Sequence, residues 1–131
     1  MLGNVASPDE IIVADLEAGI GTLTRMGEKG LDAVLVVVEA TPKSLEVGTR
    51  AAAIADERSL GRLIVVANRV RDADDLATIG SAFPSQEIVD IPDDRSIPSA
   101  DRAGVAALDA SPDAPAVLAL VGLGERLLEL T

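Results

Sequence analysis

The chain has 131 residues and a formal net charge of −11, with one aromatic residue and neither cysteine nor histidine. This length suits a single globular domain over 1–131, and the missing residue types exclude disulfides, zinc bound by cysteine or histidine, and catalysis by histidine-activated nucleophiles. The acidic charge disfavours nucleic acid and anionic membranes as partners, and no membrane span or signal peptide is recognisable, so we expect a cytoplasmic protein.

The first predicted element is a buried parallel strand over residues 10–15. Its apolar run ends at Asp15, and the chain then breaks at Gly19. A strand of this kind delivers its terminal acid to the carboxyl edge of the sheet, where open α/β folds bind ligands. The glycine-rich stretch 19–32 is predicted to be a mobile loop with at most a short helix over 22–26.

The middle of the chain predicts a strand, a helix and another strand. Residues 33–39 are aliphatic and mostly β-branched without alternation, so we expect a central strand covered on both faces. A helix over 43–59 and a strand over 62–67 follow, and the second strand closes at Asn68 and Arg69. The helix carries two neighbouring apolar stripes, one of Leu45, Gly48, Ala52 and Ala55, and the other of Val47, Ala51 and Ile54.

The last third of the chain continues this alternation. We expect a helix over 72–83, a strand over 86–91, a short helix over 96–103, and a final helix that Ser111 caps and Pro112 begins, ending near Leu130. The side chains of the final helix expected to face inward are Val117, Leu120, Val121 and Leu128. Alternating strands and helices predict an α/β fold, a three-layer sandwich with a mostly parallel sheet of about four strands flanked by helices.

Polar side chains follow three of the predicted strands. They are Asp15, the pair Asn68 and Arg69, and the run Pro92–Asp94. Because the carboxyl ends of parallel strands lie on the same side of a sheet, we expect these residues to line one crevice. A carboxylate after the first strand can hold a Mg²⁺-bound water, and an asparagine amide can read an adenine edge because it offers both a donor and an acceptor.

The same residues also allow a purely structural interpretation. Asp15 could cap a loop, Asn68 could be a turn residue with an unusual backbone angle, and Arg69 could be surface charge. Asp93 and Asp94 could simply begin a helix, since acids are favourable at helix N-termini.

Five segments, taken in chain order, resemble a known family. They are DLEAG at 15–19, LDAVLVVVE at 31–39, KSLE at 43–46, VVANRV at 65–70 and IPDD at 91–94. Together they resemble the second half of a MinD/ParA-type P-loop ATPase, and within this family they are most similar to the CooC-type ATPases that assist nickel insertion into carbon monoxide dehydrogenase. The resemblance implies a truncated P-loop NTPase-like fold with ATP and Mg²⁺ as ligands.

The resemblance also implies roles for individual residues. Asp15 matches the Walker B aspartate, the catalytic acid that holds Mg²⁺ through water, and Gly19 belongs to switch II. Asn68 and Arg69 match the adenine-contacting pair. The second adenine-side segment of the family is matched by Pro92 and Asp94.

One part of the family's pattern is missing. The phosphate-binding loop, written G-x-x-x-x-G-K-S/T, is absent, and the only lysines are Lys29 and Lys43. We therefore expect the isolated chain to bind ATP poorly and to hydrolyse it negligibly. ATP and Mg²⁺ are implied by the resemblance only, and the alternative is that the isolated chain has no cofactor. The alternative is a noncatalytic regulatory or protein-interaction module that keeps a degenerate form of the fold.

The missing part also affects the expected sheet. In the resembled fold, the strand before the phosphate loop lies between the strand ending at Asp15 and the strand over 33–39. Without it, these two strands pair directly or an exposed edge recruits another chain, because bare strand edges are templates for association. We expect an altered strand order, or a homo-oligomer or partner protein at an exposed sheet edge. Arg126 is the only basic residue of the final helix, which disfavours the DNA-binding branch of the family.

Overall fold

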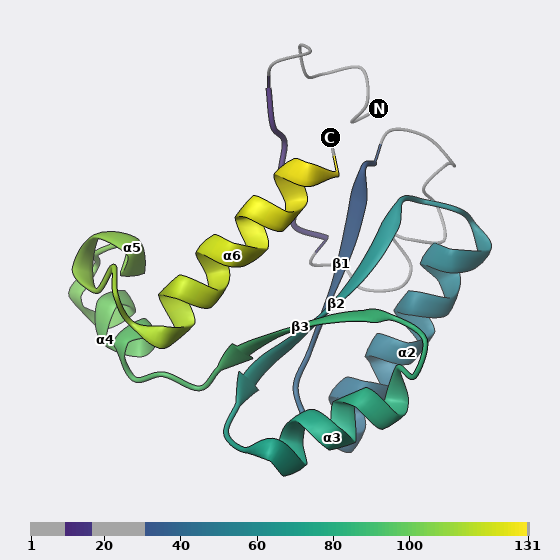
Figure 1. The fold of residues 1–131 in the computed structure, drawn as a ribbon, viewed down its shortest axis with the longest axis horizontal. Coiled ribbons are helices and arrows are strands. Elements are labelled where there is room, and N and C mark those ends of the chain that lie inside the picture. Colours follow the sequence, from purple (N-terminus) through teal and green to yellow (C-terminus); the bar gives the residue numbers. More distant parts are fainter. Residues whose placement is uncertain (1–9, 17–30, 131) are drawn as a thin grey trace.

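A computed structural model of the protein describes residues 10–16 and 31–130. Its centre is a parallel sheet of three strands in the order β1-β2-β3. The strands are β1 (Ala33–Val38), β2 (Arg62–Val70) and β3 (Glu87–Pro92). The helices are α2 (Pro42–Glu57), α3 (Ala73–Ala82), α4 (Ser96–Ala103), α5 (Ala107–Ala110) and α6 (Pro115–Glu129). Helices α2 and α3 lie on one side of the sheet and α6 on the other, which confirms a parallel α/β sandwich (Figure 1).

Each face of the sheet has its own apolar core. Under α2 and α3 the core includes Val36, Val65 and Phe83, and under α6 it includes Val66 and Leu123. Since neighbouring residues of a strand point to opposite faces, the consecutive Val65 and Val66 of β2 serve the two cores in turn. Strand β2 is therefore the covered, central strand of the described sheet.

The predicted first strand is not a strand. Residues 10–16, purple in Figure 1, have no regular secondary structure, and the described sheet has three strands instead of about four. Ile11, Ile12 and Val13 are exposed, and Leu16 packs against the core under α2. An apolar run becomes a strand only where a neighbouring edge accepts its hydrogen bonds, and no described strand pairs with this segment. The predicted direct pairing of the first two strands is therefore not found in the described part of the chain.

Strand β1 was predicted to be central and covered on both faces, and this is wrong. It lies at one end of the described strand order, and its burial alternates: Val34, Val36 and Val38 are buried, whereas Leu35 and Val37 are exposed. The continuous apolar run concealed the alternation, because both faces of the strand are aliphatic although only one is covered.

The helices mostly follow the predictions, with differences at the C-terminal end. Helix α6 begins at Pro115 instead of Pro112, and the short α5 before it was not predicted. Val117 is buried as expected, but Leu120, Val121 and Leu128 are exposed. The inward line of α6 runs through Ala116 and Leu123 instead, because the sheet lies under that face. None of the helices in the described ranges is long and apolar enough to cross a membrane. The predicted loop 19–32 lies almost wholly outside the described residues.

Candidate functional site

Three charged side chains meet at the carboxyl edge of the sheet. Arg69, near the end of β2, places Nη1 3.5 Å from Oε1 of Glu39, which follows β1. Its Nε lies 3.6 Å from Oδ1 of Asp93, which follows β3. Polar residues that follow two of the three predicted strands therefore lie at one rim of the sheet, as the parallel strand directions require.

A β-bulge positions Arg69 at this rim. Ala67 pairs with Asp90 and Val70 pairs with Pro92, so two residues of β2, Asn68 and Arg69, stand opposite a single residue of β3. Arg69 has φ of 54°, in the left-handed region that a residue with a Cβ rarely adopts. The unusual backbone angle that the sequence suggested for Asn68 thus belongs to its neighbour. Bulges of this kind occur next to binding sites because they redirect a side chain.

A third ion pair, between Arg71 and Asp75, forms one wall of the site. Arg71 Nε donates to Asp75 Oδ2 at 2.9 Å, Arg71 Nη2 donates to Oδ1 at 3.1 Å, and the backbone N–H of Arg71 donates to Oδ2 at 3.0 Å. Asp75 is buried, and its hydrogen bonds from Arg71 lower the pKa of its carboxyl to about 2. The same contacts raise the pKa of Arg71, so the pair stays ionised at any ordinary pH.

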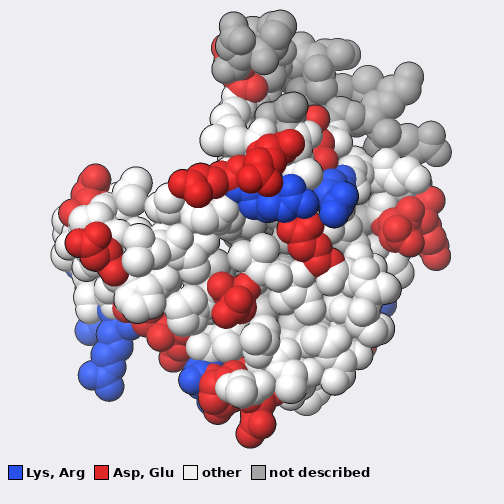
Figure 2. Space-filling model, in the orientation of Figure 1, with Lys and Arg blue, Asp and Glu red and all other residues white. Residues whose placement is uncertain are grey.

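These residues enclose a small polar hollow of about 140 Å³. Its charged lining consists of three carboxylates, Glu39, Asp75 and Asp93, and two guanidinium groups, Arg69 and Arg71. With one more acid than base, the hollow suits a neutral hydrogen-bonding group better than a triphosphate. On the face seen in Figure 2, acidic side chains are widely scattered, and basic side chains lie mostly beside acidic ones.

Two predicted adenine-side residues have structural roles at the rim. Asp94 Oδ1 accepts from the backbone N–H of Ser96 at 2.9 Å, and Oδ2 accepts from the backbone N–H of Ala116 at 3.0 Å. The hydrogen bonds from Ala116 and Ser96 lower the pKa of the Asp94 carboxyl. Pro92 ends β3 opposite Val70. These contacts match the interpretation of Asp94 as a residue that begins a helix.

The other predicted site residues lie elsewhere. Asn68 is half-buried and adjoins Arg69, but it does not line the hollow. Asp15 is exposed in the irregular segment 10–16 and does not line the hollow either, and Gly19 is outside the described residues. Within residues 10–16 and 31–130, no three acidic side chains are grouped in a way that could hold a metal ion. The role of Asp15 in binding Mg²⁺ stays a prediction.

Sequence reasoning did not assign Glu39, Thr41, Arg71 or Asp75 to the site. A usable signal existed for Glu39, because it follows an apolar strand just as Asp15 follows its apolar run. Asp75 carried no such signal. It reaches the rim only because α3 begins directly beside the end of β2, with Asp72 as N-cap accepting from the Asp75 N–H at 2.8 Å.

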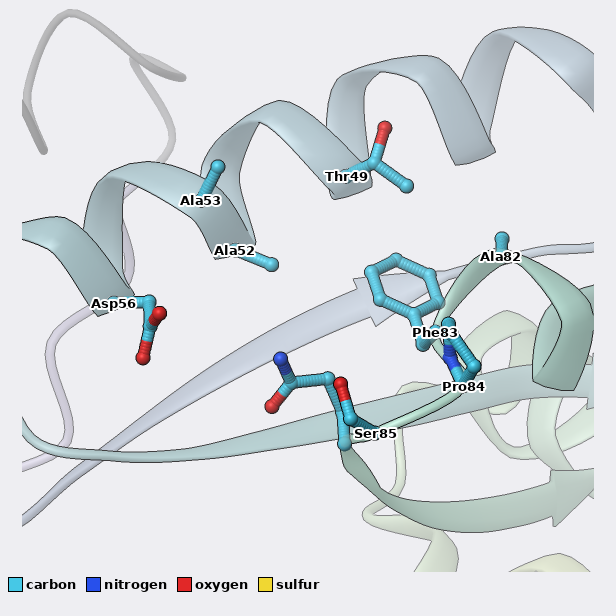
Figure 3. Close-up of a pocket in the computed structure, with 9 residues that line it drawn as sticks. Thr49, Ala52, Ala53, Asp56, Ala82, Phe83, Pro84 and Ser85 are labelled. Carbon is cyan, nitrogen blue, oxygen red and sulfur yellow. The ribbon is translucent and has the colours of Figure 1, made fainter.

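A larger hollow, about 240 Å³, lies between α2 and the end of α3. Figure 3 shows Ala52 and Asp56 of α2 on one side of it and Phe83 to Ser85 on the other. Gln86, the residue before β3, also lines it, so this hollow is at the amino end of β3, away from the rim that carries Arg69. Small side chains dominate its lining.

No family model matches the chain. An uncharacterized ATP-binding protein of Methanocaldococcus jannaschii is 36% identical over 66 residues, which is 50% of this chain and 26% of that protein. The carbon monoxide dehydrogenase accessory protein CooC of Rhodospirillum rubrum is 27% identical over 104 residues, which is 79% of this chain and 40% of CooC. The matched segments thus cover less than half of either relative. The chain is distantly similar to an ATP-binding protein and to CooC, which confirms at this level the predicted resemblance to CooC-type ATPases.

Proposed function

We propose that the chain is a nucleotide-binding, ATPase-like domain of the MinD/ParA/CooC type whose rim binds the adenosine side of ATP. The observation that carries the proposal is the bulge at Asn68 and Arg69, which holds Arg69 in a left-handed conformation at the carboxyl edge of a parallel sheet. Strained backbone of this kind persists where the surrounding structure holds it in place, and it is concentrated at ligand sites. The distant similarity to an ATP-binding protein supports the choice of ligand.

The rim offers suitable chemistry for a purine. The side-chain amide of Asn68 can donate to and accept from the edge of an adenine ring. The Arg69 guanidinium is 64% exposed, and its two ion pairs are long, at 3.5 and 3.6 Å. Exposed pairs of this kind contribute little free energy, so a ligand can displace them and the planar guanidinium can stack on the base.

The phosphates are the weak part of the site. The charged hollow has more carboxylates than guanidinium groups, and the chain has no lysine-bearing phosphate loop. Without a nest of backbone N–H groups and a cation, the triphosphate has no strong electrostatic partner. We therefore propose that the isolated chain binds nucleotide through the base, uses Asp15 at most to hold a Mg²⁺-bound water, and does not hydrolyse ATP.

Titration calorimetry tests this proposal directly. We expect the chain to bind MgATP and adenosine with similarly weak affinity, because the base carries the interaction. Asn68→Ala should weaken both by at least tenfold, whereas Gln86→Ala, an amide at the opposite end of the sheet, should leave both unchanged. Asp15→Ala should weaken the binding of MgATP but not the binding of adenosine. Absence of heat with either ligand, at concentrations up to the millimolar range, would reject the nucleotide site.

A noncatalytic interaction module is the second candidate, and one observation favours it. Leu35 and Val37 of β1 are exposed, and no strand within the described ranges pairs with the outer edge of β1. Unprotected apolar edges are unusual in monomeric proteins because they invite another chain. The two candidates differ in where a substitution acts: the rim for nucleotide, and β1 for a partner.

A further inference from the structure

The hollow between α2 and the end of α3 lies apart from the rim of the proposed nucleotide site. We call it the α2–α3 hollow and define it by four residues on one flank of α2 and by the segment 82–86. The four residues are Thr49, Ala52, Ala53 and Asp56. The segment 82–86 leads into the amino end of β3, whereas Arg69 stands at the carboxyl edge of the sheet. A ligand in this hollow therefore contacts none of the residues that we assign to nucleotide.

Small side chains leave the hollow open, and an aromatic ring forms its floor. Ala52 and Ala53 of α2 and Ala82 of α3 carry only methyl groups, so no large side chain of either helix fills the space of about 240 Å³. Phe83 is the one aromatic residue of the chain and is only 4% exposed. Its ring is directed toward α2 (Figure 3). The methyl groups and the ring offer an apolar surface on which a short hydrocarbon chain can pack.

Three polar side chains of the hollow take no part in holding the fold. Within residues 10–16 and 31–130, the side chains of Asp56, Ser85 and Gln86 make no hydrogen bond or ion pair. Thr49 differs, because its hydroxyl donates to the backbone oxygen of Leu45 at 2.8 Å. Asp56 and Ser85 lie on opposite sides of the space (Figure 3). The hollow therefore presents three groups whose hydrogen-bonding capacity the described residues leave unused.

These three groups match a primary ammonium. An ammonium has three N–H donors, and the available acceptors are the carboxylate of Asp56, the hydroxyl of Ser85 and the amide oxygen of Gln86. Asp56 is the only charged residue among those that line the hollow, so no guanidinium competes for it as Arg69 and Arg71 do for the acids of the rim. The net charge of −11 also attracts cations and repels anions.

We propose that the α2–α3 hollow binds a small alkylammonium ligand. Its charged group bonds to Asp56, and its hydrocarbon chain packs on Ala52 and Phe83. The hollow, at about 240 Å³, is smaller than the roughly 300–1,000 Å³ of pockets for drug-sized ligands, so the chain of the ligand is short. Free alkylamines and lysine side chains both present this chemistry. The site is independent of the proposed nucleotide-binding function, because the two lie at opposite ends of the sheet.

Nuclear magnetic resonance with pentylammonium and its neutral counterpart n-pentanol tests the proposal. The two probes have the same hydrocarbon chain and differ in the charged group. We expect pentylammonium to shift the backbone amide signals of residues 49–56 and 82–86, with a dissociation constant of about a millimolar, as a few contacts at an open site allow. Pentanol should bind about fivefold more weakly, because it has no charge to pair with Asp56.

Three variants check which residues bind the probe. Asp56→Asn removes the charge and keeps the shape, so it should raise the dissociation constant of pentylammonium by about fivefold. Glu57→Gln is the matched control, because Glu57 is an exposed acid next to Asp56 in α2 that does not line the hollow. It should leave the affinity unchanged. Ala53→Leu fills the hollow from an exposed helix position without altering any charge, and it should abolish the amide shifts.

A blocked lysine separates the two sources of the ligand. Nα-acetyl-lysine methylamide carries the same ammonium on a peptide backbone. Affinity equal to that of pentylammonium would assign the hollow to a lysine side chain of a partner protein, and weaker binding would assign it to free alkylamines. The absence of amide shifts up to tens of millimolar, equal affinity for pentanol, or equal losses for Asp56→Asn and Glu57→Gln would overturn the proposal. Equal losses would mean that the acidic surface as a whole attracts the probe.

Discussion

Asp94 connects the end of β3 to α6, because its Oδ2 accepts a hydrogen bond from the backbone N–H of Ala116 at 3.0 Å, 22 residues further along the chain. Its other oxygen accepts from the backbone N–H of Ser96 at the start of α4. One carboxylate thus satisfies backbone donors at the beginnings of two helices, where such donors have no partner within the helix. The aspartate that the resemblance assigned to the adenine side therefore shapes the rim by holding these two helices.

Replacing Asp94 by alanine should destabilise the fold. Two helix N-terminal N–H groups lose their acceptor, and we expect the melting temperature to fall by on the order of 5 °C. Thermal unfolding followed by circular dichroism measures this change. Asp101→Ala removes an exposed aspartate within α4 and should change the melting temperature by less than about 1 °C. Equal melting temperatures for the two variants would contradict a structural role of Asp94.

Acid should destabilise the protein partly through Asp75. The folded-state pKa of Asp75 is lowered to about 2 from an ordinary value of 3.8, so between about pH 5 and pH 2 the unfolded chain binds more protons at this site. The contribution of Asp75 to the free energy of unfolding is therefore present above pH 5 and is lost as the pH falls toward 2. Urea unfolding at a series of pH values should show a smaller decrease for Asp75→Asn than for the wild-type chain.

The neighbouring Asp74→Asn is the control for this measurement. Asp74 is an exposed acid in the same first turn of α3. The free energy of unfolding of the Asp74→Asn variant should therefore fall with pH as that of the wild-type chain does. If the two variants lose stability in parallel as the pH falls, the hydrogen bonds from Arg71 to Asp75 do not cause the loss of stability in acid.

Gly48→Ala should be destabilising although alanine favours helices. A Cβ at this position in α2 would collide with Cγ1 of Val38 and come within 3.4 Å of Cζ of Phe83. Overpacking of this kind costs about 1–3 kcal/mol of unfolding free energy. Gly122→Ala in α6 meets no atom within 4 Å and should instead stabilise by about 1 kcal/mol. Urea unfolding of both variants measures the two effects, and a stabilised Gly48→Ala protein would show that α2 lies further from β1.

Arg69→Gly should stabilise the fold while weakening the proposed nucleotide site. Glycine adopts the observed φ of 54° without a Cβ penalty, and the two exposed ion pairs that are lost contribute little. We expect an increase of about 1 kcal/mol in the free energy of unfolding. Arg69→Ala removes the same ion pairs but keeps the Cβ, so it should show no such gain. A difference near zero between these variants would mean that the bulge stores no strain.

Several features could be predicted from the sequence because they depend on local order. The helix over 43–59, the strand over 62–67 and the strand over 86–91 each have a periodicity or a β-branched run that has one reasonable interpretation, and each is found within a few residues. The meeting of Arg69 and Asp93 at one rim also followed, because parallel strands place their carboxyl ends at the same edge of a sheet.

The features that could not be predicted depend on segments that are distant in the sequence. The apolar run ending at Asp15 has the pattern of a strand, but whether it pairs depends on a strand edge elsewhere in the molecule. In the structure this run has no regular secondary structure. The run over 33–39 reads as a covered strand, but the covering of its second face is a tertiary property, and Leu35 and Val37 are exposed.

The sequence by itself determined the α/β class, the order of the elements from β1 to α4 and the residues that follow each of these strands. Only the tertiary structure decided that Arg69 occupies a left-handed bulge, that Asp94 accepts hydrogen bonds from two helices and that β1 lies at one end of the described strand order. The physical reason is that periodicity reports the preference of a segment for a buried or exposed side, whereas hydrogen-bond partners and covering layers come from segments far away in the chain.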